Sequence, residues 1–240
     1  MTDIDTPETD PATADYVASA ARAVLGAVPF AGSLLAELAG SVIPNQRIDR
    51  LCRFAHELEQ RLQGLDRQAV RAQLSNENFT DLTEEALRQA ARSTTDDRRR
   101  YIANLLATGL STSTVSFIEA KHLLRILGEI NDIEIVWLRF YLNPVMDGDT
   151  EFRKKHEAVL QPVAASFGSE QTEIDRETLQ DSYRAHLVQL GLLEERYRID
   201  SRTKLPEFDR SGRPTVQGHE ITRLGRLLLS QLGLGEDPAV

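Results

Sequence analysis

The sequence predicts a mainly α-helical protein, in which an N-terminal helical bundle with an apolar helical hairpin is followed by a winged-helix-like α+β module. Two observations support this prediction. Apolar residues recur at three- and four-residue spacings through most of residues 45–142, which is the period of an amphipathic helix. The remaining chain then follows the order helix, strand, long polar turn, strand, helix, which is the order of a winged-helix module.

Composition restricts the class of protein. The chain has 240 residues, 41 % of them hydrophobic and 27 % charged, which is typical of a soluble globular protein with one or two domains. Its formal net charge of −9 works against nucleic-acid binding, which depends on neutralising phosphates with Lys and Arg. A single cysteine allows no internal disulfide, and no signal segment opens the sequence, so we expect a cytoplasmic protein.

Residues 1–14 are predicted to be a disordered acidic tail, whereas residues 15–44 are predicted to form an apolar helical hairpin. The uncharged run in this hairpin has 14 residues, fewer than the ~20 needed to span a bilayer as a helix. Two interpretations remain open, a hairpin buried in the bundle and a segment that enters membranes or self-associates. The side chains that would contact a membrane or partner are Val24, Leu25, Val28, Pro29, Phe30, Leu34, Leu35 and Leu38.

Residues 45–74 are predicted to form one long amphipathic helix inside a bundle that covers 15–115. Their apolar residues follow an unbroken alternation of three- and four-residue steps: Ile48, Leu51, Ala55, Leu58, Leu62, Leu65, Ala69 and Ala72. Three alanines in this row favour close packing within a bundle over a separate coiled coil. Gly64 is expected to weaken the helix without ending it.

Further helices are predicted from their capping residues. Asp81 with Glu84 predicts a helix over 82–92, after a loop at 76–80, and Asp96 with Asp97 opens a helix over 96–110. The pairs Ser116 with Glu119 and Asn131 with Glu134 have the spacing of capping boxes, and they predict helices over 117–130 and 133–142.

The winged-helix-like domain is predicted over 116–235, with an irregular or partly helical insertion at 143–173. A helix over 175–190 would end at Gly191, because glycine commonly follows the last helical residue. Two strands would flank a polar wing at 200–214, and Thr222 would cap a last helix over 223–232.

The predicted recognition helix of this module is poor in basic residues. Its candidate nucleic-acid contacts are Arg176 and Arg184, which stand beside Glu177 and Asp181. The wing adds Arg202, Lys204, Arg210 and Arg213, which could contact phosphates. We therefore expect a module used for folding or for protein contact, and a DNA-binding transcriptional regulator is the alternative.

The sequence contains no arrangement that indicates catalysis. The five histidines have no metal-ligand spacing, and neither a phosphate-binding glycine loop nor a nucleophile elbow is present. Cys52 lies four residues before His56, but a half-buried structural cysteine is the expected state. We therefore expect a non-enzymatic protein without metal, cofactor or small-molecule substrate.

One segment resembles a known family. The residues Arg99-Arg100-Tyr-Ile-Ala-Asn-Leu-Leu-Ala-Thr-Gly-Leu110 are similar to the Ala-Asn-Leu-Leu-Ala signature of the bacterial abortive-infection alpha (Abi-alpha) family, within a resemblance over about 82–142. The resemblance implies a non-enzymatic helical protein of phage defence, and it carries over no catalytic residues. We expect such a protein to act through its apolar N-terminal helices on a protein partner, a second copy or the inner membrane.

Overall fold

The computed structural model describes residues 48–63, 65, 67–111, 116–145, 148–166 and 168–235. The chain is mainly helical, with a small two-stranded antiparallel sheet near its C-terminus. It divides into two compact units, Met1–Arg125 and Ile126–Val240. The acidic tail, the apolar hairpin and all eight of its candidate contact residues, Val24 to Leu38, lie outside the described residues.

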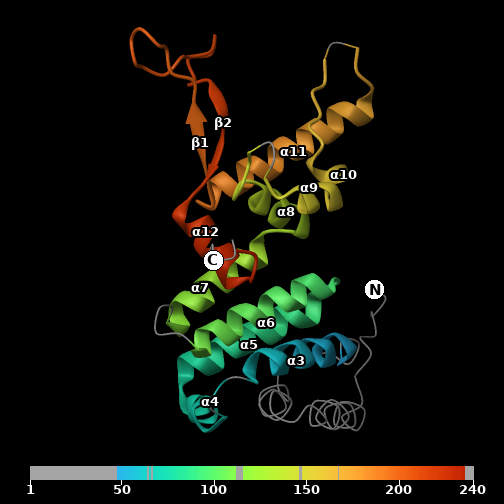
Figure 1. Cartoon of the computed structure of the whole chain (residues 1–240), viewed down its shortest axis with the longest axis vertical. Helices are drawn as coiled ribbons and strands as arrows, with labels where there is room; N and C mark the ends of the chain where they lie inside the picture. Colours follow the sequence, from blue (N-terminus) through green and yellow to red (C-terminus); the bar gives the residue numbers. More distant parts are fainter. Residues whose placement is uncertain are drawn as a thin grey trace, which may run out of the picture. The chain divides into compact units, whose positions relative to one another are not determined.

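The first unit is built from helices with buried apolar faces. Its elements are α3 (Ile48–Leu62), α4 (Arg67–Ala72), the short 3-10 helix η2 (Gln73–Ser75), α5 (Glu77–Arg92), α6 (Asp96–Ser111) and the start of α7 (Phe117–Glu129). Helices α3, α5 and α6 pack side by side (Figure 1). Leu51, Ala55, Leu58 and Leu62 of the predicted apolar row are buried in α3, together with Phe54.

The prediction of one continuous helix over 45–74 is wrong. The structure has α3 as far as Leu62 and a second helix, α4, from Arg67. Ala72, at the end of the predicted apolar row, is exposed. The interruption lies between Leu62 and Arg67, although Gly64, at a cost of about 1 kcal/mol relative to alanine, is expected from the sequence to weaken the helix without ending it.

The start of α5 also differs from the prediction. The helix begins at Glu77, because Asn76 caps it by accepting the backbone N–H of Asn78 at 3.0 Å. The segment 76–80 is therefore mostly helix and not a loop, and Phe79 within it is fully buried. The helix predicted over 96–110 is confirmed as α6.

The boundary between the two units falls inside α7, after Arg125. The sequence predicted it before α7, between residues 115 and 116. The first turns of α7 pack on the first unit. The ring of Phe117 lies 5.5 Å from that of Phe79, and Lys121 forms an ion pair with Asp81. Gln89 of α5 donates its Nε2–H to the carbonyl of Leu124 at 2.8 Å.

The second unit consists of α8 (Asp132–Phe140), α9 (Thr150–Lys155), α10 (Glu157–Leu160), α11 (Gln171–Gln189), β1 (Leu193–Tyr197), β2 (Val216–Ile221) and α12 (Arg223–Gln231). The segment 143–173 is partly helical, as predicted. Helix α8 packs against α10, α11 and α12, and β1 pairs with β2 in antiparallel register, Leu193 opposite Ile221.

The capping signals predicted for α8 and α12, and the predicted glycine stop of α11, are confirmed in this unit. Asn131 and Glu134 form the predicted capping box of α8. Gly191 has a φ of +71°, a conformation that glycine adopts without strain, and it ends α11. The hydroxyl of Thr222 accepts the backbone N–H of Gly225 at 3.0 Å and caps α12. These contacts fix where the helices around the sheet begin and end.

Candidate interaction surface

The strands β1 and β2 continue into an ordered extension, residues 198–215, which includes the polar stretch 200–214 that the sequence predicts as a wing. Figure 1 shows it beyond the paired strands, at their end away from α12. Arg198 donates its backbone N–H to Thr215 at 2.8 Å and accepts the N–H of Glu207 at 2.8 Å. Thr215 in turn donates to the carbonyl of Glu207 at 2.7 Å. The middle of the extension, at Glu207, is therefore hydrogen-bonded to both of its ends, Arg198 and Thr215.

Two tight turns form the outer part of the extension, and an aspartate organises each. The Oδ1 of Asp200 accepts the backbone N–H of Arg202 at 2.9 Å and of Thr203 at 2.6 Å. The Oδ1 of Asp209 accepts the backbone N–H of Ser211 at 2.8 Å and of Arg213 at 3.0 Å. Such side-chain bonds are the mechanism by which aspartate stabilises turns.

These hydrogen bonds favour the ionised carboxylates. The backbone N–H of Thr203 holds the pKa of Asp200 below its ordinary value, and the Ser211 hydroxyl does the same for the pKa of Asp209. Both turns therefore keep their anchoring charge near neutral pH. Five Lys or Arg side chains against three Asp or Glu still leave the extension with a net charge of +2.

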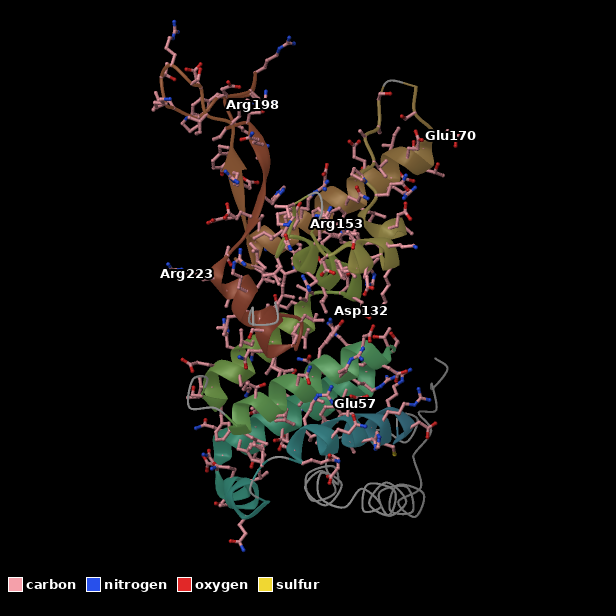
Figure 2. All side chains as sticks on the ribbon, in the orientation of Figure 1. Glu57, Asp132, Arg153, Glu170, Arg198 and Arg223 are labelled. Atoms are coloured by element: carbon pink, nitrogen blue, oxygen red, sulfur yellow. The ribbon has the colours of Figure 1, made fainter. Side chains whose placement is uncertain are left out.

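The four predicted wing cations are exposed and have no ion-pair partner in the described part of the chain. Arg198 differs from them, because it pairs with Glu207 at 3.8 Å. Figure 2 labels Arg198 and shows the side chains of the extension spread outward around the two turns. The four exposed cations are Arg202, Lys204, Arg210 and Arg213.

Large apolar side chains are exposed beside these cations. Ile199 is 50 % exposed, Leu205 62 % and Phe208 61 %. Exposed apolar groups gathered in one place commonly mark an interaction site, whereas single ones are ordinary. Of the exposed side chains on the extension, only the cations were predicted from the sequence as contacts. The apolar residues could have been found as interruptions of the polar stretch, each within two residues of an Arg or Lys.

The structure does not group the two α11 arginines with these cations. Arg184 pairs with Asp181 at 2.5 Å, and its guanidinium lies 5.2 Å from the ring centre of Trp137. It therefore packs within the unit, contrary to the prediction of an exposed contact. Arg176 is exposed, and its nearest described polar contact is the carbonyl of Ala158 at 3.5 Å.

Cys52 has the properties of a structural thiol. Burial raises its pKa, and the nearby Asp49 adds to the effect, so the thiol stays protonated at neutral pH. The Nε2 of His56, its sequence-predicted neighbour, lies 2.9 Å from the Nε2 of Gln60. Within the described ranges, no group of three or more His, Cys, Asp or Glu is placed to hold a metal ion.

Comparison with known proteins adds no match. No protein-family model, no curated protein and no solved structure matches this chain. Among the described helices, none combines the length and apolar character needed to cross a membrane.

Proposed function

We propose that this chain is a non-enzymatic bacterial interaction protein that docks on an anionic membrane surface through residues 198–215. The observation that carries the proposal is the presence of exposed cations and exposed apolar side chains on the same short extension. The resemblance of residues 99–110 to the abortive-infection alpha family supports a role in phage defence. The place of action would be the cytoplasmic face of the inner membrane.

The extension is proposed as the wing of a winged-helix-like module. The order α8, α10, α11, β1, extension, β2 supports this interpretation, since α11 directly precedes the hairpin. In this arrangement α11 would be the recognition helix. Its first half carries Glu173, Asp175 and Glu177 against the single cation Arg176. Because an acidic helix repels phosphates, we expect the module to contact its partner through the wing and not through α11.

The chemistry of the wing matches a lipid headgroup region. Each Lys or Arg near an anionic bilayer contributes about 1 kcal/mol of attraction. Leu205 and Phe208 would leave water for the acyl boundary, and burying such side chains fully is worth about 1.5–3 kcal/mol each. Duplex DNA phosphates would contact the cations and would leave Leu205 and Phe208 in water. The apolar component therefore favours a membrane.

Liposome flotation of the full chain tests the proposal. We expect flotation with vesicles of phosphatidylglycerol and phosphatidylcholine, and little with phosphatidylcholine alone, because the cations need anionic headgroups. Leu205→Ser with Phe208→Ser should reduce flotation. Ile118→Ser is the matched control, since Ile118 is 65 % exposed but lies on α7. Equal flotation of the double variant and this control would contradict the proposal.

The predicted apolar segment 15–44 can be tested in the same assay. Leu34→Asp with Leu35→Asp in the full chain places two charges in its uncharged run. If this variant fails to float and the wing variant floats normally, membrane binding belongs to the N-terminal segment. If neither variant changes flotation, membrane binding by both segments is excluded.

DNA binding is the second candidate, and the four cations without ion-pair partners favour it. Fluorescence anisotropy with random duplex DNA over a range of salt concentrations tests this function. Binding below micromolar concentration at physiological salt, with a steep salt dependence, would rank the DNA-binding regulator above the membrane protein. Arg210→Gln with Arg213→Gln should then weaken binding and reduce the salt slope by up to about two.

A further inference from the structure

The second unit contains a surface hollow that the wing does not contribute to. It lies between α8, α10 and α11 and has a volume of about 170 Å³. Its apolar walls are formed by Ile133, Trp137, Val159 and Leu179. A cavity of about 150 Å³ with apolar walls holds one benzene ring, so this hollow accepts a ligand body of that size.

A buried glutamine in the lining, Gln180, hydrogen-bonds the backbone of α10 and of the segment after it. Gln180 of α11 is 6 % exposed and donates its Nε2–H groups to the carbonyls of Gln161 at 2.9 Å and Val159 at 3.4 Å. Its Oε1 accepts the backbone N–H of Val163 at 3.4 Å. The segment that follows α10 is thereby fastened to α11, which preforms one wall of the hollow.

Apart from the amide of Gln180, whose hydrogen bonds are made within the protein, the polar side chains in the lining are those of Arg176 and Tyr183, and both can donate. Arg176 faces no carboxylate within the described residues and contacts only the carbonyl of Ala158, at 3.5 Å. In the same part of the chain, the buried indole N–H of Trp137 has no hydrogen-bond partner. The half-buried Tyr183, with its phenol O–H, also lines the hollow. A cation and hydrogen-bond donors beside apolar walls select an anion with an apolar body, because charge-assisted hydrogen bonds are the stronger kind.

We propose that this hollow is a binding site for a small carboxylate that has a ring-sized apolar body. The ring lies against Trp137, Val159 and Leu179, and the carboxylate accepts hydrogen bonds from Arg176 and Tyr183. The site is independent of the proposed membrane surface, since none of its residues belongs to the extension.

Benzoate is a suitable probe, with benzyl alcohol as its neutral counterpart. Trp137 is the only tryptophan in the chain, so its indole N–H resonance in proton–nitrogen correlation spectra reports on this site alone. In the full chain we expect a saturable shift with benzoate. Benzyl alcohol should bind about tenfold more weakly, because it offers no charge to Arg176.

Three variants make the result specific. Arg176→Gln should weaken benzoate about tenfold and remove its advantage over benzyl alcohol. Arg223→Gln, which removes an exposed arginine from α12, is the matched control and should leave the affinity unchanged. Ala158→Leu fills the hollow from its exposed rim and should abolish binding without removing a polar group.

The same titrations can overturn the proposal. A shift that never saturates, or equal affinities for benzoate and benzyl alcohol, would show that the hollow does not select a carboxylate. Unchanged benzoate affinity in both Arg176→Gln and Ala158→Leu would place the probe elsewhere. Far-ultraviolet circular dichroism of each variant verifies that the helices are intact.

Discussion

The Nδ1 of His186 lies 2.6 Å from the Oε1 of Glu134, a contact that joins α11 to the first turn of α8 across 52 positions in the sequence. The other carboxylate oxygen of Glu134 accepts the backbone N–H of Asn131 at 2.7 Å. Asn131 accepts the backbone N–H of Glu134 at 2.9 Å in return. One side chain, 3 % exposed, therefore completes a helix cap and fastens a second helix to it.

Glu134→Ala should destabilise the second unit by about 2–4 kcal/mol, because hydrogen bonds to a charged group contribute about 1.5–3 kcal/mol each and are not fully additive. Urea unfolding followed by Trp137 fluorescence measures the change, since Trp137 lies in the same helix. Glu129→Ala removes an exposed glutamate from α7 and should change stability by less than about 0.5 kcal/mol. Equal midpoints for the two variants would disprove the structural role of Glu134.

Gly225→Ala should also be destabilising, for a steric reason. A Cβ at this position in α12 would lie 2.4 Å from the carbonyl oxygen of Leu192 and 2.8 Å from Cγ1 of Ile221. Backbone must move to admit it, which we expect to cost about 1–3 kcal/mol. Gly218→Ala is the control, because a Cβ there meets nothing within 4 Å. Thermal unfolding distinguishes the two, and a normal melting temperature for Gly225→Ala would refute the close packing of α12.

Stability should fall as the pH drops through the ordinary pKa of histidine, 6.5, partly because of His219. Burial lowers the pKa of His219, and the charge of Arg184 lowers it further, while Glu195 and Asp181 act in the opposite direction. Just below pH 6.5, His219 therefore binds a proton more readily in the unfolded chain than in the folded chain. The contribution of the neutral imidazole is thus complete above this value and declines below it, until the folded group is protonated.

Urea unfolding at a series of pH values checks this expectation. His219→Gln should flatten the dependence of stability on pH between about pH 7.5 and pH 5. His122→Gln replaces an exposed histidine of α7 and serves as the comparison. An equally steep pH dependence in His219→Gln and in the unchanged protein would rule out this contribution of His219.

Asp209→Ala should loosen the outer turn of the extension, because its Oδ1 accepts hydrogen bonds from Ser211 and from the backbone N–H of Arg213. We expect faster tryptic cleavage after Arg210, with little change in the melting temperature of the chain; the bond after Arg213 resists trypsin because Pro214 follows it. Asp175→Ala, which removes an exposed aspartate from α11, should not alter cleavage there. Unchanged cleavage rates in Asp209→Ala would mean that the turn does not depend on the carboxylate.

Several elements could be predicted from neighbouring residues, because the forces involved act within one helical turn. The capping box of Asn131 and Glu134 and the stop at Gly191 were read correctly from spacing. Periodicity failed between α3 and α4, because the row of apolar positions continues through Leu65 and Ala69 across the break. It also missed Asn76 as the cap of α5, because Asp81 with Glu84 offers the same spacing further along.

The candidate surface was predicted only in part. The four cations of the extension named from the sequence are exposed. Exposure of Ile199, Leu205 and Phe208 depends on whether anything packs over the extension, and no local pattern reports that. Arg184 illustrates the opposite outcome. It reads as a surface cation in the sequence, yet the fold places it over Trp137, a residue 47 positions away.

The amino-acid sequence by itself determined the mainly helical class and those helix ends that caps or glycine mark, as at α6, α8 and α12, because hydrophobic periodicity and capping act between near neighbours. Only the tertiary structure decided which polar groups find partners. Glu134 meets His186, Arg184 meets Trp137, and Arg176 is left beside an apolar hollow. These pairings depend on how helices distant in the sequence pack, and packing is a property of the whole unit.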